Sequence, residues 1–257
     1  MKETAIIEKE KVELKRPVLI EGLPGLGLVG KIATEYLVKQ LKATRIAELY
    51  SPHFAYYVLV NSKGSVRLLR CEFYCWKNET GESDLILLTG DSQAQTIEGQ
   101  YEVADAILGF ASKMNVEAIM TIGGYRKEGE EEPQTLVSAT SQKVLDKALE
   151  AGAKESPPGS PIVGTAGLLL GLAKIKGADA LCFLVETPGY LPDPKAAKSV
   201  LKVLMKMLKF KVDLSGLDKE ISKSAHIEER MKRIEEQRRI SEKRRRRIEE
   251  EKVSYIS

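Results

Sequence analysis

Short apolar runs alternate with amphipathic segments along most of this chain, and this alternation limits the possible fold more than any other feature. Strand-like runs are expected at residues 17–21, 84–89, 116–122 and 180–186, and helical periodicity is expected at 31–42, 97–113, 141–151, 164–175 and 196–208. A buried strand, a helix and a further strand form the repeating unit of a parallel sheet. The pattern therefore predicts a single α/β domain with a mostly parallel sheet flanked by helices.

Three β-rich runs interrupt this alternation at residues 45–50, 55–60 and 65–76, and they predict an antiparallel insertion. Within the last run, Cys71 and Cys75 would lie on one face roughly 13 Å apart, which is too far for a disulfide. The third cysteine is Cys182, and the chain has two histidines. We expect the cysteines to be reduced and to pack as small apolar side chains, and no metal site is predicted.

The last forty residues differ sharply from the rest of the chain. Between Asp218 and Lys252 lie 13 of the 40 Lys and Arg and 10 of the 37 Asp and Glu, which leaves 27 of each sign elsewhere. The formal net charge of +3 therefore belongs to this segment. Because it has few apolar residues to bury, it is expected to project into solvent. The sequence predicts a domain at residues 1–216 and a projecting charged helical C-terminal arm at residues 217–257.

Apolar residues at the base of the arm have the three-and-four spacing of a coiled coil, first at Leu214, Leu217 and Ile221 and then at Ile227, Met231 and Ile234. We expect contacts there to assist oligomerisation and the distal half to be mobile. The basic run at residues 243–247 is surrounded by glutamates and has no interleaved aromatic residue, so no nucleic-acid partner is predicted. The charged N-terminus and the absence of an apolar run near 20 residues predict a cytoplasmic protein without a membrane partner.

The segment Gly25-Leu26-Gly27-Leu28-Val29-Gly30 satisfies G-x-G-x-x-G between an expected strand and an expected helix. In a dinucleotide-binding or nucleoside-processing enzyme, Gly25, Gly27 and Gly30 would let the pyrophosphate approach the backbone, and Glu48 would bind the ribose. The other interpretation is that these glycines permit tight strand-to-helix packing. The second interpretation is favoured, because an apolar loop beginning at Pro24 offers little to a nucleotide, and no cofactor is predicted.

Ligands of α/β proteins collect outside the carboxyl ends of parallel strands, where Glu21, Asp91, Gly123-Gly124 and Glu186 are expected to gather. These acids are interpreted as solvated or capping groups, because no metal cluster, catalytic histidine or nucleophile motif accompanies them. His53 is interpreted as a hydrogen-bonded structural residue. No catalytic, cofactor-binding or metal-binding residue is therefore predicted.

Several segments together resemble the PAC2 family, the proteasome assembly chaperone group, in its archaeal branch. The resemblance covers most of residues 15–210, and its main segments are Gly22-Leu23-Pro24-Gly25-Leu26-Gly27-Leu28-Val29-Gly30, Gln95 to Tyr101, Thr121-Ile122-Gly123-Gly124, Val163 to Leu170 and Glu186 to Pro194. It implies a phosphorylase-like α/β domain without established catalytic activity. It also implies a homo-oligomer that engages the 20S proteasome or its parts, or another PAC2-family protein.

The resemblance also implies a purpose for the arm. By its resemblance to archaeal members of the family, the chain is expected to form an oligomer. The C-terminal segments of such an oligomer would reach pockets of the proteasome through a hydrophobic-Tyr-any tripeptide. An aromatic anchor with a free terminal carboxylate suits such a pocket. This chain departs from the pattern, because Tyr255 is third from the end and is followed by Ile256 and Ser257. Tyr255, Ile256 and Ser257 are the predicted partner-binding residues.

Overall fold

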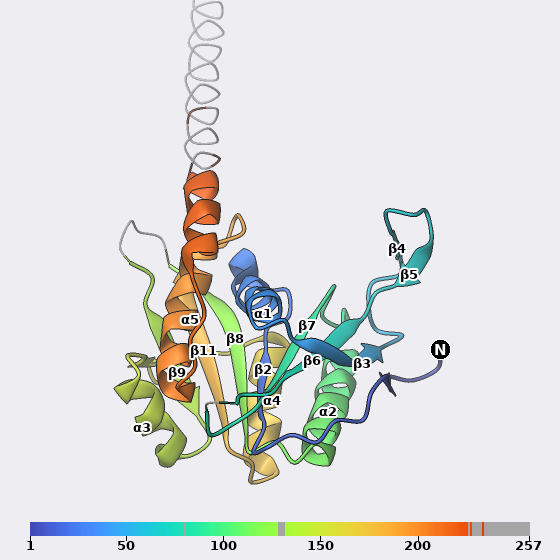
Figure 1. Ribbon diagram of the computed structural model, residues 1–257, viewed down its shortest axis with the longest axis horizontal. Helices are drawn as coiled ribbons and strands as arrows, with labels where there is room; N and C mark the ends of the chain where they lie inside the picture. Colours follow the sequence, from blue (N-terminus) through green and yellow to red (C-terminus); the bar gives the residue numbers. More distant parts are fainter. Residues whose placement is uncertain (80, 128–131, 226, 228–232, 234–257) are drawn as a thin grey trace, which may run out of the picture.

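Nine strands join into one mixed sheet in the computed structural model of this chain, and helices cover both faces of that sheet (Figure 1). The structure describes residues 1–79, 81–127, 132–225, 227 and 233. The strand order is β1-β3-β6-β7-β2-β8-β11-β9-β10, and β4 pairs with β5 in a separate hairpin. The strands are β1 (Ala5–Glu8), β2 (Val18–Glu21), β3 (Thr44–Tyr50), β4 (Val58–Val60), β5 (Val66–Leu68), β6 (Cys71–Trp76), β7 (Leu85–Gly90), β8 (Ala118–Arg126), β9 (Thr135–Ala139), β10 (Lys154–Glu155) and β11 (Ala180–Thr187).

Helices follow several of the strands, and α2 and α5 begin at a residue whose side chain accepts a capping hydrogen bond. They are α1 (Val29–Gln40), α2 (Ile97–Lys113), α3 (Gln142–Glu150), α4 (Gly164–Ile175) and α5 (Pro194–Leu208), and residues 215–225 are helical as well. At the start of α2, the side chain of Thr96 accepts a hydrogen bond from the N–H of Gly99. At the start of α5, Asp193 does the same for Ala196, and proline occupies the first helical position. No helix in the described part of the chain is long and apolar enough to cross a membrane.

The sheet is mixed, and the expectation that it would be mostly parallel is wrong. The neighbouring strands β7, β2, β8 and β11 are parallel, as is the short β9–β10 pair, whereas β1–β3, β3–β6, β6–β7 and β9–β11 are antiparallel. A parallel pair needs a long crossover, which helices provide, and no helix separates β3 from β7 or β8 from β9. The predicted antiparallel insertion at residues 45–76 is confirmed.

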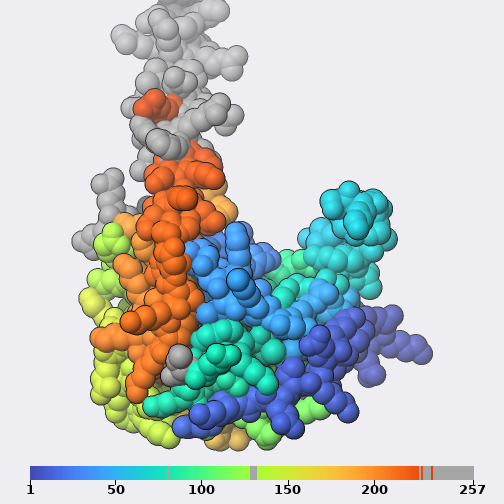
Figure 2. Space-filling model, viewed as in Figure 1, coloured from blue at the N-terminus to red at the C-terminus, as the bar shows by residue number. Residues whose placement is uncertain are grey.

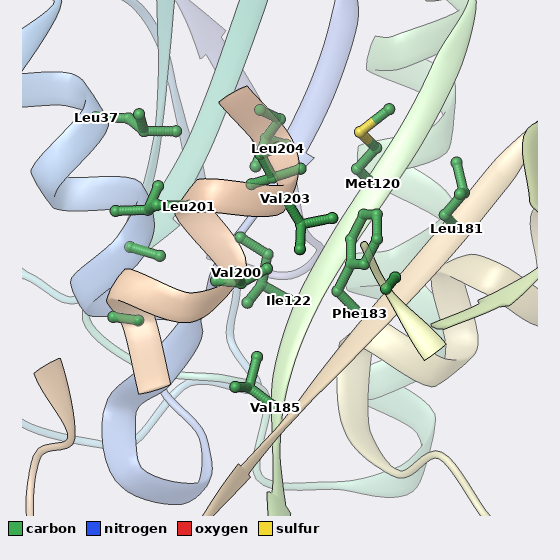
Figure 3. Packing of buried hydrophobic residues seen from close by; sticks show 14 of the residues in the cluster. Leu37, Met120, Ile122, Leu181, Phe183, Val185, Val200, Leu201, Val203 and Leu204 are labelled. Carbon is green, nitrogen blue, oxygen red and sulfur yellow. The ribbon is translucent and has the colours of Figure 1, made fainter. Parts of the chain in front are cut away.

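Two apolar clusters hold the helices against opposite faces of the sheet. On one face, α1 and α5 contribute Leu37, Leu201 and Leu204, which pack over Ile122 and Phe183 of the sheet (Figure 3). On the other face, α2 and α4 pack through residues that include Val103, Ile107, Leu169 and Ala173. Every residue of β7 is buried, as expected for a central strand covered on both sides. The centre of the sheet is therefore inaccessible, and ligands or partners can approach only its edges and the loops.

Several details differ from the sequence-based expectations. On α2, Tyr101 is exposed, as is Ile97 one turn earlier, whereas Val103 is buried. Gly123 and Gly124 lie within β8 and do not end it. The strands β1, β9 and β10 were not predicted, and β1 and β10 are short edge strands whose side chains are mostly exposed. The bounds of α2 and α4 agree with the expected ranges.

Candidate functional site

The carboxyl ends of β7, β2, β8 and β11 meet at one edge of the sheet, and the glycine loop at residues 22–28 lies on that edge. The register places Glu21 of β2 beside Leu88 of β7 and Thr121 of β8. At the same edge, β8 and β11 remain paired as far as Arg126 and Thr187. Segments that are far apart in the sequence therefore meet where α/β proteins place their ligands.

The glycines of the loop allow close contact between parts of the protein's own backbone. A Cβ atom on Gly22 would lie 2.1 Å from the carbonyl oxygen of Gly30, and one on Gly30 would lie 2.4 Å from that of Ile122. Gly27 has a φ of 61°, and a Cβ there would meet Oγ1 of Thr187 at 2.7 Å. The structural interpretation of these glycines is therefore supported, because protein atoms occupy the space that their missing side chains leave.

Leu26 is held between two further glycines from different segments. A Cβ atom on Gly124 of β8 would lie 2.4 Å from the carbonyl oxygen of Leu26, and one on Gly189 would lie 2.5 Å from its Cδ1 atom. Asp193 also binds the loop. Its N–H donates to the carbonyl oxygen of Gly27 at 2.8 Å, and its Oδ2 accepts from the hydroxyl of Thr187 at 2.7 Å. The loop is thus fixed to β8 and to the segment that follows β11.

Gln93 connects the glycine loop to the start of α4. Its Nε2 donates to the carbonyl oxygen of Pro24 at 2.7 Å, and its Oε1 accepts from the N–H and the hydroxyl of Thr165 at 3.0 and 3.1 Å. The same hydroxyl approaches Oε1 of Gln100 at 2.8 Å. Neither Gln93 nor Thr165 was predicted from the sequence, because the bonds from Gln93 to Pro24 and from Thr165 to Gln93 and Gln100 join residues 65 or more positions apart. The only signal was their position in or beside the segments that carried the family resemblance.

Glu21 is the most unusual ionisable group at this edge. It is 1% exposed, its Oε1 accepts from the N–H of Leu23 at 3.0 Å, and its Oε2 has no hydrogen-bond partner among the described residues. Burial raises the pKa of this carboxyl to about 7, against a smaller opposing effect of the Leu23 hydrogen bond. A substantial part of Glu21 is therefore protonated near neutral pH.

The other acids expected at this edge are engaged separately. Asp91 accepts from Nη2 of Arg67 at 2.9 Å and from the N–H of Arg70 at 3.0 Å. Burial alone would raise its pKa, but these bonds and the Arg67 charge hold the pKa of Asp91 below its usual value. Glu186 pairs with Lys127 at 2.8 Å and accepts from the N–H of Gln134. In the described part of the chain, no two of the carboxyl groups of Glu21, Asp91 and Glu186 share a hydrogen bond. The acids therefore do not form one cluster, and each is bound or buried separately.

Glu48 does not lie where the less favoured dinucleotide interpretation would need a ribose-binding acid. Its strand, β3, is separated from β2 by β6 and β7. The Glu48 side chain is almost fully buried and pairs with Lys9, Arg45 and Arg70 at 2.9 to 3.2 Å. The strand that follows β2 in the sequence, β3, is thus not its neighbour in space, because β6 and β7 lie between them.

The remaining nucleophile and base candidates are structural. Cys71, Cys75 and Cys182 are unpaired and buried, and burial raises the pKa of Cys182 to about 12, which opposes thiolate chemistry. His53 links Oγ1 of Thr96 at 2.9 Å to Oε2 of Glu102 at 3.2 Å, which confirms its hydrogen-bonded role at the start of α2. Among the described residues, no group of three or more His, Cys, Asp or Glu could hold a metal ion.

The base of the arm is anchored to the domain. Leu217 is fully buried in the cluster under α1 and α5. The hydroxyl of Tyr36 donates to the carbonyl oxygen of Asp213 at 2.6 Å, and Lys198 pairs with Asp218. Figure 1 shows residues 215–225 leaving the domain beside α1, on the side of the molecule where the β4–β5 hairpin also projects. The direction in which the chain leaves the domain is therefore set by packing.

At the start of the expected coiled-coil seam, Leu217 packs inside its own chain and not against another subunit. Leu217 is buried within its own chain, so it is unavailable to another subunit, whereas Ile227 is exposed. Met231 and Ile234 lie outside the described residues, as do the predicted partner-binding residues Tyr255, Ile256 and Ser257 and the basic run at 243–247.

The chain is similar to known proteins over most of its length. A family model described as the PAC2 family matches residues 19–235. Among curated proteins, an uncharacterized protein of Methanocaldococcus jannaschii is 34% identical over 230 residues, which are 89% of this chain and 88% of that protein.

Two solved structures from Pyrococcus furiosus are similar over nearly the whole chain. PbaB, described as an archaeal proteasome activator, is 38% identical with a TM-score of 0.86, and the match covers 90% of this chain and 100% of PbaB. PbaA, described as an archaeal homolog of proteasome-assembly chaperone, is 30% identical with a TM-score of 0.74, and the match covers 97% and 98% of the two chains.

Proposed function

The chain belongs to the PAC2 family, and on that premise we propose that it is a non-enzymatic proteasome-binding protein, an assembly chaperone or activator. The observation that carries this proposal is the similarity to PbaB over the full length of that chain. The proposed protein forms a homo-oligomer and docks on the 20S proteasome, or on its subunits, through its C-terminal tail.

The geometry of the loop edge supports a binding role more than catalysis. Glycines 22, 30 and 124 bring protein backbone into close contact and Gly27 lies against the side chain of Thr187, so the loop is braced by the protein itself. The acids at the edge are each held by their own partners or, for Glu21, buried. Such an arrangement is rigid. Among the described residues at this edge, no acid, base and nucleophile are identified within reach of one another.

The anchored base of the arm supports tail docking. Leu217 and Tyr36 fix the start of the helix at residues 215–225, so the point at which this helix leaves the domain is the same in each subunit. Because the segment that follows is charged and has few apolar residues, we expect it to offer Tyr255, Ile256 and Ser257 to the proteasome. Several tails on one oligomer raise the effective concentration, which offsets a weak individual motif.

The test is native mass spectrometry with an archaeal 20S proteasome, using the full-length protein and a variant that lacks residues 254–257. Full-length protein should bind, and the deletion should abolish binding while leaving the oligomer intact. Ser254→Ala is the matched control, because it changes the segment beside the tyrosine and keeps the chain length and the terminal carboxylate.

Two results would count against the proposal. Equal binding by the deletion variant would move the docking surface away from the tail. Failure of the full-length oligomer to bind, together with a nucleotide retained by the purified protein, would instead favour an enzyme that uses the glycine loop.

A further inference from the structure

The β4–β5 hairpin turns an entirely apolar face outward. Its register places Val58 opposite Leu68 and Val60 opposite Val66, so these four side chains share one face. Their exposed fractions run from 47% to 68%. In an ordinary two-stranded ribbon at a protein surface, the polar face would point to solvent and the apolar face toward the core.

The other face of the hairpin shows that this orientation is built into the structure. Leu59 is partly buried and packs against the apolar cluster beneath α2. Directly opposite it, Arg67 is bound by Asp91 through a bidentate ion pair. One apolar and one charged contact therefore hold the inner face against the domain, and the apolar outer face is left without a cover.

The turn of the hairpin is well organised. Oδ1 of Asn61 accepts from the N–H groups of Lys63 and Ser65 at 3.0 and 3.1 Å, and Gly64 adopts a φ of 78°. Figure 2 shows the hairpin standing clear of the rest of the molecule. It thus presents a preformed surface that loses little conformational freedom on binding.

Two exposed tyrosines immediately precede β4 in the chain. Tyr56 is fully exposed and Tyr57 is more than half exposed, and with the four aliphatic residues they form what we call the hairpin patch. From their exposed fractions and side-chain areas of roughly 150–230 Å², these six residues offer on the order of 700 Å². The four aliphatic residues of the outer face supply about half of this area, and the total is comparable with the roughly 800 Å² that each partner contributes to a standard interface.

We propose that the hairpin patch is an interface between subunits and that its occupant is a second copy of this chain. The patch contains no charged residue, because Lys63 lies in the turn and Arg67 points to the inner face. Two copies can therefore share this surface without repulsion between like charges. The patch also combines β-branched residues with low net charge, a combination that aggregates unless it is covered soon after synthesis. Another copy of the same chain is the partner available at that moment.

This inference deepens the proposed function, since it assigns a surface to the oligomer that would carry the tails. It is tested without proteasome, so its failure can be told apart from failure of tail docking.

The experiment is sedimentation-velocity centrifugation of the full-length protein across a concentration series. The test variant is V60K/V66K, which places two charges on the outer face at positions that are each more than 60% exposed. The control is Ile175→Lys, the same kind of change at an apolar residue that is 82% exposed at the end of α4. Tyr56→Ser is a second test variant, because a fully exposed side chain cannot be required for folding.

Wild type and Ile175→Lys should both sediment as oligomers. V60K/V66K should raise the concentration needed for assembly about 30-fold or more, the loss expected from a hot spot, and Tyr56→Ser should weaken assembly in the same direction. Monomeric wild-type protein would overturn the proposal, as would unchanged assembly of folded V60K/V66K. If circular dichroism shows that V60K/V66K is unfolded, the Tyr56→Ser result decides.

Discussion

Replacing Glu21 by glutamine should make the stability of this protein less dependent on pH. Glu21 is enclosed at the end of β2, and the interactions that shift its pKa are burial and one backbone hydrogen bond, without a contribution from a cation. Glutamine has the shape of the protonated acid and keeps the oxygen that accepts from Leu23. The substitution therefore removes one titration and little packing.

The size of the effect follows from the shift of the pKa from 4.5 to about 7. Between these values the folded protein holds a proton that the unfolded chain has released, so stability falls as pH rises. At 1.36 kcal/mol for each pKa unit, the loss is about 3 kcal/mol, complete above pH 7 and absent below pH 4.5. The Glu21→Gln variant does not suffer this loss.

Guanidinium unfolding of wild type and Glu21→Gln at pH 5 and pH 8.5 measures the effect. At pH 5 the two free energies of unfolding should agree within about 1 kcal/mol, and at pH 8.5 the variant should be more stable by about 2–3 kcal/mol. Glu132→Gln, at an exposed acid paired with Lys195, is the matched control for the charge change. A difference between wild type and Glu21→Gln that is the same at both pH values would refute the reasoning.

Two further substitutions test the loop edge and the arm. Gly30→Ala should destabilise the protein by about 1–3 kcal/mol, because its Cβ would meet the carbonyl oxygen of Ile122. Gly109→Ala is its control in α2, where a Cβ meets nothing within 4 Å and should stabilise by about 0.5–1 kcal/mol. Leu217→Ala should cost about 2–5 kcal/mol of unfolding free energy, since the side chain is fully buried. Denaturant unfolding measures all three, and a cost below 1 kcal/mol at Leu217 would show that the arm does not begin in the core.

Helices and central strands were predictable because their signals are local. The apolar spacing from Ile97 to Lys113 and from Gly164 to Ile175 predicted both helices with the bounds that the structure shows. The direction of the outer strands was not predictable to the same degree. A run such as Thr135–Ala139 carries no mark of the strand it will pair with, and it lies antiparallel to β11 through backbone hydrogen bonds that any sequence can make.

The candidate functional site was likewise predictable only in part from the sequence. Sequence pattern found the glycine loop and the structural use of its glycines, and the family resemblance found the segments that surround it. The alternative dinucleotide interpretation needed the next strand along the chain, which carries Glu48, to lie beside β2, but β6 and β7 lie between them. Gln93 was missed because a lone glutamine has no pattern, and its role depends on Pro24 and Thr165.

The sequence by itself determined the α/β elements, the glycine loop, the charged C-terminal segment and the membership of a family, all of which depend on residue types in a fixed order. Only the tertiary structure decided which groups meet. It buried Glu21 away from any cation, anchored Leu217 under α1 and α5, and turned the apolar face of β4–β5 outward. Each of these outcomes depends on contacts between residues distant in the chain, and burial, which sets both the pKa of an acid and the exposure of a valine, is a property of the assembled fold.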